Sequence, residues 1–162
     1  MSITVDYFFN YPEGLAAIAE LMNKSLGCSL SPYKGDSQDM FSRFLGMELS
    51  LSSHDFENDK DLNFEEYAFY LSLRTPMGLA ALRGMQLSAM AYIAYILYFG
   101  FKITGMLVYD GQILLARYEE QVDSEAGENW LYDTTSKQFV TFPEHIDKLR
   151  KRVPKGSGLA WR

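Results

Sequence analysis

The acidic side chains of residues 54–63, HDFENDKDLN, have the strongest capacity for chemistry in this chain, and we call this stretch the acidic loop. With the next three residues it can be aligned on the twelve-residue calcium loop, in which oxygen ligands recur at fixed steps. Positions 1, 3, 5 and 12 then hold carboxylates, at Asp55, Glu57, Asp59 and Glu66. Position 6 needs glycine for a sharp turn, but it holds Lys60, whose charge also repels a cation. Because the flanking residues alternate with period two instead of forming helices, we predict no metal site and no cofactor.

The two histidines and the single cysteine form no local catalytic or metal motif. His54 and His145 make no HxxxH or HExxH pair, and one cysteine cannot build a structural zinc site. We expect His145 to be exposed in the first turn of a helix, His54 to be solvated and Cys28 to be a small buried hydrophobe. A dyad of Cys28 with a histidine stays open, because such partners meet only in three dimensions. We assign no catalytic residue, and the pattern favours a non-enzyme without closing the question.

The charge of the chain is −6 and is unevenly distributed. Residues 1–147 hold all 21 acidic residues, whereas residues 148–162 hold six Lys or Arg and no acid. An acidic body repels phosphate backbones, so we expect no nucleic-acid partner. One cysteine and an N-terminus without a basic start and apolar run predict a cytoplasmic protein.

The long uncharged stretch Met85–Phe101, MQLSAMAYIAYILYFGF, organises the predicted fold. Its 17 residues are fewer than the about 20 of a typical membrane span, and no second such stretch exists. It is apolar around most of its circumference, which is typical of a buried core helix, so we predict no membrane association. The helix also carries three tyrosines at close spacing, and a buried tyrosine hydroxyl needs a polar partner. A pocket beside this helix is therefore a second hypothesis, lined by Tyr92, Tyr95 and Tyr98.

Strands are predicted in runs on either side of this helix. Alternating or β-branched patterns predict strands at residues 3–9, 47–53, 64–74, 103–109 and 112–118, with short ones at 28–33, 130–132 and 138–141. Asp110-Gly111 is a strong hairpin turn, and 47–53 and 64–74 are expected to pair antiparallel. Met40 to Leu45 has the spacing of a single helical turn. We therefore predict a single α+β domain over residues 1–154, with a mainly antiparallel sheet packed on a long buried central helix.

Two shorter helices are predicted at the ends of this domain. Asn10 has the chemistry of an N-cap for a helix over residues 13–26, and Gly27 is a natural stop. Thr141 and Glu144 form a capping box before a helix over residues 144–153. Residues 155–162 are expected to be a flexible basic tail.

The acidic loop is the predicted binding surface. Its charge suits electrostatic capture of a basic protein. The candidate partner-binding residues, chosen by charge and predicted exposure, are Asp55, Phe56, Glu57, Asp59 and Asp61.

In its general character the chain resembles the small acidic immunity proteins of bacterial toxin systems. The resemblance rests on LSSHDFENDKDLNFEEYAFYLSLR and on the closing NWLYDTTSKQFVTFPEHIDKLRKR, a strand pair that runs into a capped helix. It implies a bacterial, non-enzymatic protein that binds and blocks a cognate toxin. The alternative is an enzyme or small-molecule binder that uses the tyrosine-lined pocket. A pocket beside Tyr92 or Tyr95 with a titratable group inside would favour that alternative.

Overall fold

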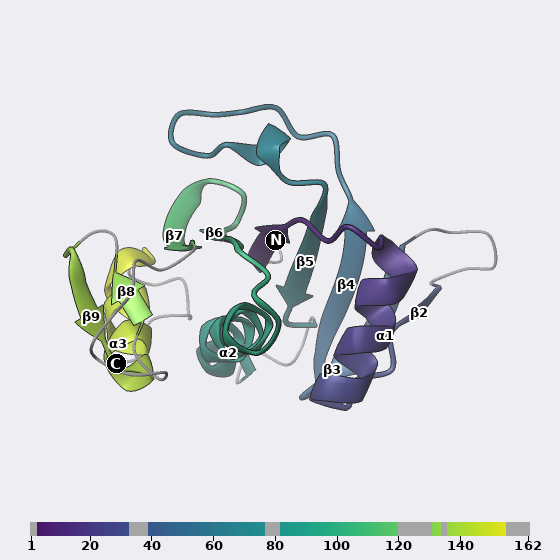
Figure 1. Cartoon of the computed structure of the whole chain (residues 1–162). Coiled ribbons are helices and arrows are strands. Elements are labelled where there is room, and N and C mark those ends of the chain that lie inside the picture. The colour runs from purple at the N-terminus through teal and green to yellow at the C-terminus, as the bar shows by residue number, and fades with distance from the viewer. Residues whose placement is uncertain (1–2, 33–38, 77–81, 120–130, 134–135, 155–162) are drawn as a thin grey trace.

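The computed structural model describes residues 3–32, 39–76, 82–119, 131–133 and 136–154, and it has the predicted α+β architecture (Figure 1). In chain order the elements are β1 (Thr4–Phe9), α1 (Leu15–Leu26), β2 (Ser31–Pro32), β3 (Met40–Phe44), β4 (Met47–Ser53), the 3-10 helix η1 (Phe64–Glu66), β5 (Phe69–Arg74), α2 (Arg83–Phe101), β6 (Gly105–Tyr109), β7 (Ile113–Tyr118), β8 (Leu131–Asp133), β9 (Gln138–Val140) and α3 (Phe142–Arg152). The basic tail expected at 155–162 lies outside the described residues.

Seven strands form one antiparallel sheet in the order β2-β3-β4-β5-β1-β6-β7, and β8 and β9 form a separate hairpin. The predicted pairing of 47–53 with the following strand is confirmed, since Leu49 lies opposite Leu73 in the β4–β5 register. The Asp110-Gly111 turn between β6 and β7 is confirmed as well, with φ of 48° and 68° at its two residues. The N-terminal strand β1 lies between β5 and β6, so residues distant in sequence meet in the middle of the sheet.

One face of the sheet carries the main core. Side chains alternate along a strand, so Tyr7 and Leu71 face the core whereas Phe8 and Ser72 face the other way. Helices α1 and α2 pack on the core face, and α3 packs on α2, β7 and β8 (Figure 1). Among the described residues, the acidic loop and η1 pack on the second face, which we call the open face, where Leu62 and Phe64 are buried.

The predicted central helix is α2. Seven of its side chains are 0 % exposed, whereas Met85 and Tyr92 on the other side are 44 % and 49 % exposed. The helix is long and apolar enough to cross a membrane, a property that the core helix of a soluble protein shares. Its buried Gln86 is fully hydrogen-bonded. The amide nitrogen donates to the carbonyl oxygens of Ile3 (2.8 Å) and Leu73 (2.7 Å), and Thr75 Oγ1 donates to its Oε1 (2.9 Å). These bonds hold the start of α2 against β1 and β5 and remove the cost of a buried amide.

Three local predictions are wrong. Residues 40–45 contain strand β3 rather than a helical turn, because pairing with β4 supplies hydrogen bonds that a single turn cannot match. The strand expected at 64–74 starts only at Phe69, because the preceding residues form η1. Asn10 does not cap α1, which begins after Gly14; its side chain instead bonds the backbone of Glu66 and Ala68, at 2.7 Å each.

The predicted helix ends at Gly27 and Thr141 are confirmed. Gly27 ends α1 in the left-handed conformation at φ 67°. Thr141 Oγ1 accepts a hydrogen bond from the Glu144 backbone nitrogen at 3.4 Å and donates to the Glu144 carboxylate at 3.0 Å.

Candidate functional site

The acidic loop joins β4 to β5 and is anchored at its far end. Leu62 and Phe64 are buried against Phe8, Met106 and Val108, which form a small second core on the open face. This apolar contact packs the C-terminal end of the acidic loop against the middle of the sheet. The loop therefore has a defined position over β1 and β6.

The backbone of the acidic loop is held by hydrogen bonds. Asp59 and Leu62 exchange two backbone bonds, at 2.9 and 2.8 Å, around a turn in which Lys60 has φ of 54°. Asn58 Oδ1 accepts from the Glu65 nitrogen at 2.9 Å, and Arg117 donates to the Asp61 carbonyl oxygen at 2.6 Å. The position that would be glycine in a calcium loop is thus a left-handed lysine in a tight four-residue turn.

The carboxylates of the acidic loop are exposed to solvent. All five candidate partner-binding residues are exposed, and none of the four acids makes an ion pair within the described part of the chain; they are Asp55, Phe56, Glu57, Asp59 and Asp61. Across the described residues, no three His, Cys, Asp or Glu side chains converge as a metal site requires. The loop presents separate negative charges rather than a chelating cluster.

Phe56 is the apolar member of this surface and remains 44 % exposed. Its ring rests on an aromatic cluster, at centroid distances of 5.0 Å from His54, 5.6 Å from Tyr70 and 5.7 Å from Phe64. His54 is only half-buried in this cluster, and burial lowers its pKa. The expected solvated histidine is therefore part of the support under Phe56, with its Nδ1 accepting from the Phe56 backbone nitrogen at 3.1 Å.

A polar groove of about 380 Å³ lies beside the loop on the open face, and we call it the sheet groove. The register places hydroxyl residues of neighbouring strands side by side, with Ser50 opposite Ser72 and Ser52 opposite Tyr70. At one end Arg74 Nε donates to Glu48 at 2.8 Å. The residues that line the sheet groove are Thr4, Asp39, Met40, Phe41, Glu48, Ser50, Ser52, Tyr70, Ser72 and Arg74.

Asp6 lies in β1 next to the groove, opposite Ser72, and is 6 % exposed. Burial raises the pKa of this carboxyl group to about 6, although hydrogen bonds from Ser72 and Thr4 oppose the shift. Thr4 Oγ1 donates to Oδ2 at 3.0 Å, whereas Oδ1 has no donor among the described residues. Asp6 is a functional candidate that the sequence does not reveal, because an acid inside a β-branched and aromatic strand carries no local signal of its burial.

The three tyrosines of the pocket hypothesis do not share one environment. Tyr92 is 49 % exposed, the Tyr95 ring packs at a tilt against Phe142 of α3 with centroids 4.7 Å apart, and the Tyr98 hydroxyl donates to the Glu119 carbonyl oxygen. They connect α2 to α3 and to the end of β7. The sheet groove and a smaller apolar hollow beside α1 are lined by other residues.

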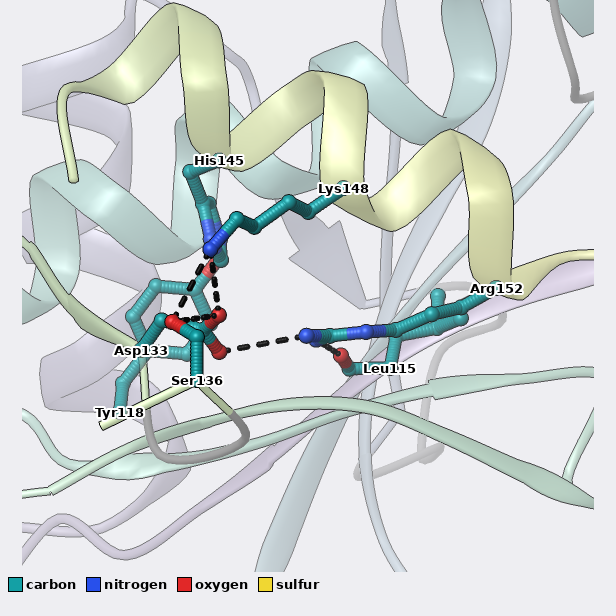
Figure 2. A network of polar contacts seen from close by, with 7 residues as sticks. All are labelled: Leu115, Tyr118, Asp133, Ser136, His145, Lys148 and Arg152. Carbon is teal, nitrogen blue, oxygen red and sulfur yellow. Dashed lines mark hydrogen bonds and ion pairs between the residues drawn. The ribbon is translucent and has the colours of Figure 1, made fainter. Parts of the chain in front are cut away.

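A buried polar network fastens α3 to β7 and β8 (Figure 2). Asp133 is at its centre, bonded to Lys148 Nζ at 2.9 Å, to Arg152 at 3.2 Å and to the Ser136 hydroxyl at 2.8 Å. Arg152 also donates to the Leu115 carbonyl oxygen. Two cations and a hydroxyl thus compensate one buried carboxylate.

The prediction that His145 is exposed is wrong. The ring is 5 % exposed and its Nε2 lies 2.6 Å from the Tyr118 hydroxyl, because the first turn of α3 packs onto β7 (Figure 2). Burial and the nearby Arg152 lower its pKa to about 4, and burial raises that of Tyr118 well above its ordinary value. Both groups are therefore neutral at pH 7, and each has the other as a partner.

Cys28 is buried as expected, and its thiol is hydrogen-bonded to Asn23 and not to either histidine. Its thiol donates to Asn23 Oδ1 at 3.4 Å, and burial raises its pKa. A thiol with a raised pKa is a weak nucleophile at neutral pH.

Comparison of the chain with protein-family models, with curated proteins and with solved structures finds no match. Function must therefore be argued from the surfaces of this chain itself.

Proposed function

We propose that this protein is a non-enzymatic binding protein that captures a basic protein partner through the acidic loop. One observation carries the proposal: four exposed carboxylates without an ion pair in the described chain stand on a backbone held by hydrogen bonds. Unpaired charges of one sign attract an oppositely charged partner and accelerate its association.

The ordered backbone and Phe56 strengthen this proposal. A loop that is already in its final shape loses little conformational entropy on binding. Phe56 is a partly exposed aromatic ring with a packed base, among carboxylates, which is the composition of a binding hot spot. The arrangement supports capture rather than chemistry, since its carboxylates do not converge on a common point.

The resemblance to immunity proteins makes the partner class more specific. We propose that the basic partner is a toxin and that the protein works in the bacterial cytoplasm. The alternative, a small-molecule site lined by Tyr92, Tyr95 and Tyr98, has less support, because these tyrosines mainly join helices and strands.

The test is a pull-down from the native cell with two variants of equal charge. The first carries Asp55→Asn, Glu57→Gln, Asp59→Asn and Asp61→Asn. The control removes four exposed acids elsewhere, by Glu13→Gln, Glu20→Gln, Glu119→Gln and Asp147→Asn. Wild type and control should recover the same basic protein, with capture falling as salt rises, whereas the loop variant should lose it.

Two results would contradict the proposal. Equal capture by both variants would separate binding from the acidic loop. Capture that does not change with salt would remove its electrostatic basis.

A further inference from the structure

The sheet groove and the acidic loop form one continuous surface. Phe56 of the loop contacts Tyr70, which lines the groove, with ring centroids 5.6 Å apart. Ser52, also in the lining, is two residues before His54, where the loop begins. A partner seated on the loop therefore lies next to the mouth of the groove.

The charge of the groove favours a cation. Asp39 and Glu48 line it together with one cation, Arg74, which is bonded to Glu48. Asp6 adds a further carboxylate beside Ser72 and Thr4 of the lining. An anion would meet a net negative field here, and a neutral ligand would gain nothing from it.

The hydroxyl groups of the groove suit the same occupant. Ser50, Ser72 and Thr4 each carry lone pairs that accept hydrogen bonds from an ammonium or guanidinium group. The volume of about 380 Å³ is within the range of about 300–1,000 Å³ of small-ligand sites, enough for one long side chain.

We propose that the sheet groove receives an arginine or lysine side chain of the basic partner. This inference rests on the proposed function and adds a second contact region to it. The buried Asp6 carboxylate lies beside the groove and has one oxygen without a donor among the described residues, so it gains from a nearby positive charge. A cation above Ser72 lowers the cost of ionising Asp6 without direct contact, because electrostatic interactions extend across several ångströms in a poorly solvated site.

The test uses a small probe, so it does not depend on finding the partner. N-acetyl-arginine amide is titrated into the wild-type chain and followed by the backbone amide NMR signals of Ser50 and Ser72. N-acetyl-citrulline amide, of nearly the same shape but uncharged, is the control probe. We expect saturable shifts with the arginine probe and at least about tenfold weaker binding of the citrulline probe. Equal binding of the two probes, or no shift at these serines, would overturn the inference.

Three single variants sharpen the test. Glu48→Gln removes one negative charge from the groove lining, and Asp6→Asn removes one from directly beside it; each should weaken binding of the arginine probe by about threefold or more. Glu20→Gln removes the same charge from α1, on the core side of the sheet, and should leave binding unchanged. An equal effect of all three variants would mean that only net charge matters and would overturn the assignment to the groove.

The failure of this inference is distinguishable from the failure of the proposed function. The four-residue loop variant should still bind the arginine probe in the groove, while losing the protein partner. If the wild-type chain showed no arginine-probe signal but still captured the basic protein in a loop-dependent way, only the groove assignment would be overturned.

Discussion

Asp133 and Asp6 are the two buried carboxylates of the described chain, and their surroundings differ. Asp133 contacts two cations and a hydroxyl within 3.2 Å (Figure 2), whereas Asp6 is bonded by the Thr4 hydroxyl and has one oxygen without a donor among the described residues. A compensated carboxylate in a closed network serves the fold. An uncompensated one beside an open groove costs stability, and such costs are typical of binding surfaces.

The two regions also respond to pH with opposite signs. The pKa of His145, in the network, is lowered, so protons bind the unfolded chain more tightly there. The pKa of Asp6 is raised, so protons bind the folded chain more tightly. Between about pH 4 and 6 the two contributions to stability therefore oppose each other.

The largest expected effect comes from Asp133→Ala. It leaves Lys148 and Arg152 without their shared carboxylate, and we expect the free energy of unfolding to fall by about 4 kcal/mol. Urea denaturation at pH 7 measures this. The control is Asp147→Ala, whose carboxylate is 69 % exposed and 3.5 Å from Arg150, and it should cost at most about 0.5 kcal/mol. Similar losses for both variants would show that the network is no stronger than a surface pair.

His145→Gln should remove a large part of the acid sensitivity of the fold. A pKa lowered from 6.5 to about 4 contributes about 3 kcal/mol, which is present above pH 6.5 and is lost as the pH falls toward 4. Urea unfolding of wild type and variant across pH 4–7 gives the two slopes. His54→Gln, at the half-buried histidine, should keep most of the wild-type slope. An unchanged slope in His145→Gln would mean that the ring is not buried as described.

Asp6→Asn should stabilise the protein at neutral pH, by about 2 kcal/mol. A pKa raised from 3.8 to about 6 means that ionisation in the folded state costs free energy above pH 6, and asparagine avoids it. Asparagine keeps an unpaired polar group there, so part of the cost remains. Below about pH 3 the variant and wild type should be similarly stable, because Asp6 is then mainly protonated in both the folded and the unfolded state. A destabilised variant at pH 7 would make Asp6 a structural residue like Asp133.

Local signals determined much of the fold. The period-two pattern of 47–53, the Asp110-Gly111 turn, the capping residues around Thr141 and the uncharged central stretch each specify an element through neighbours in the chain. The exposure of the acidic loop was predictable too, since isolated charges are rarely buried. The role of that loop stays a prediction.

Tertiary contacts decided what local signals could not. Asn10 has the chemistry of a helix cap, but it bonds backbone 56 residues away because β1 brings it next to the end of η1. His145 is in a helix turn that looks exposed, yet α3 packs onto β7 and buries it. Asp6 and the serines of β4 and β5 share a surface only because β1 is inserted beside β5. By itself the sequence determined which residues are acidic, which are apolar and which can cap a helix. The order of the strands decided which of these residues are buried, because burial depends on contacts with residues that are distant in the sequence.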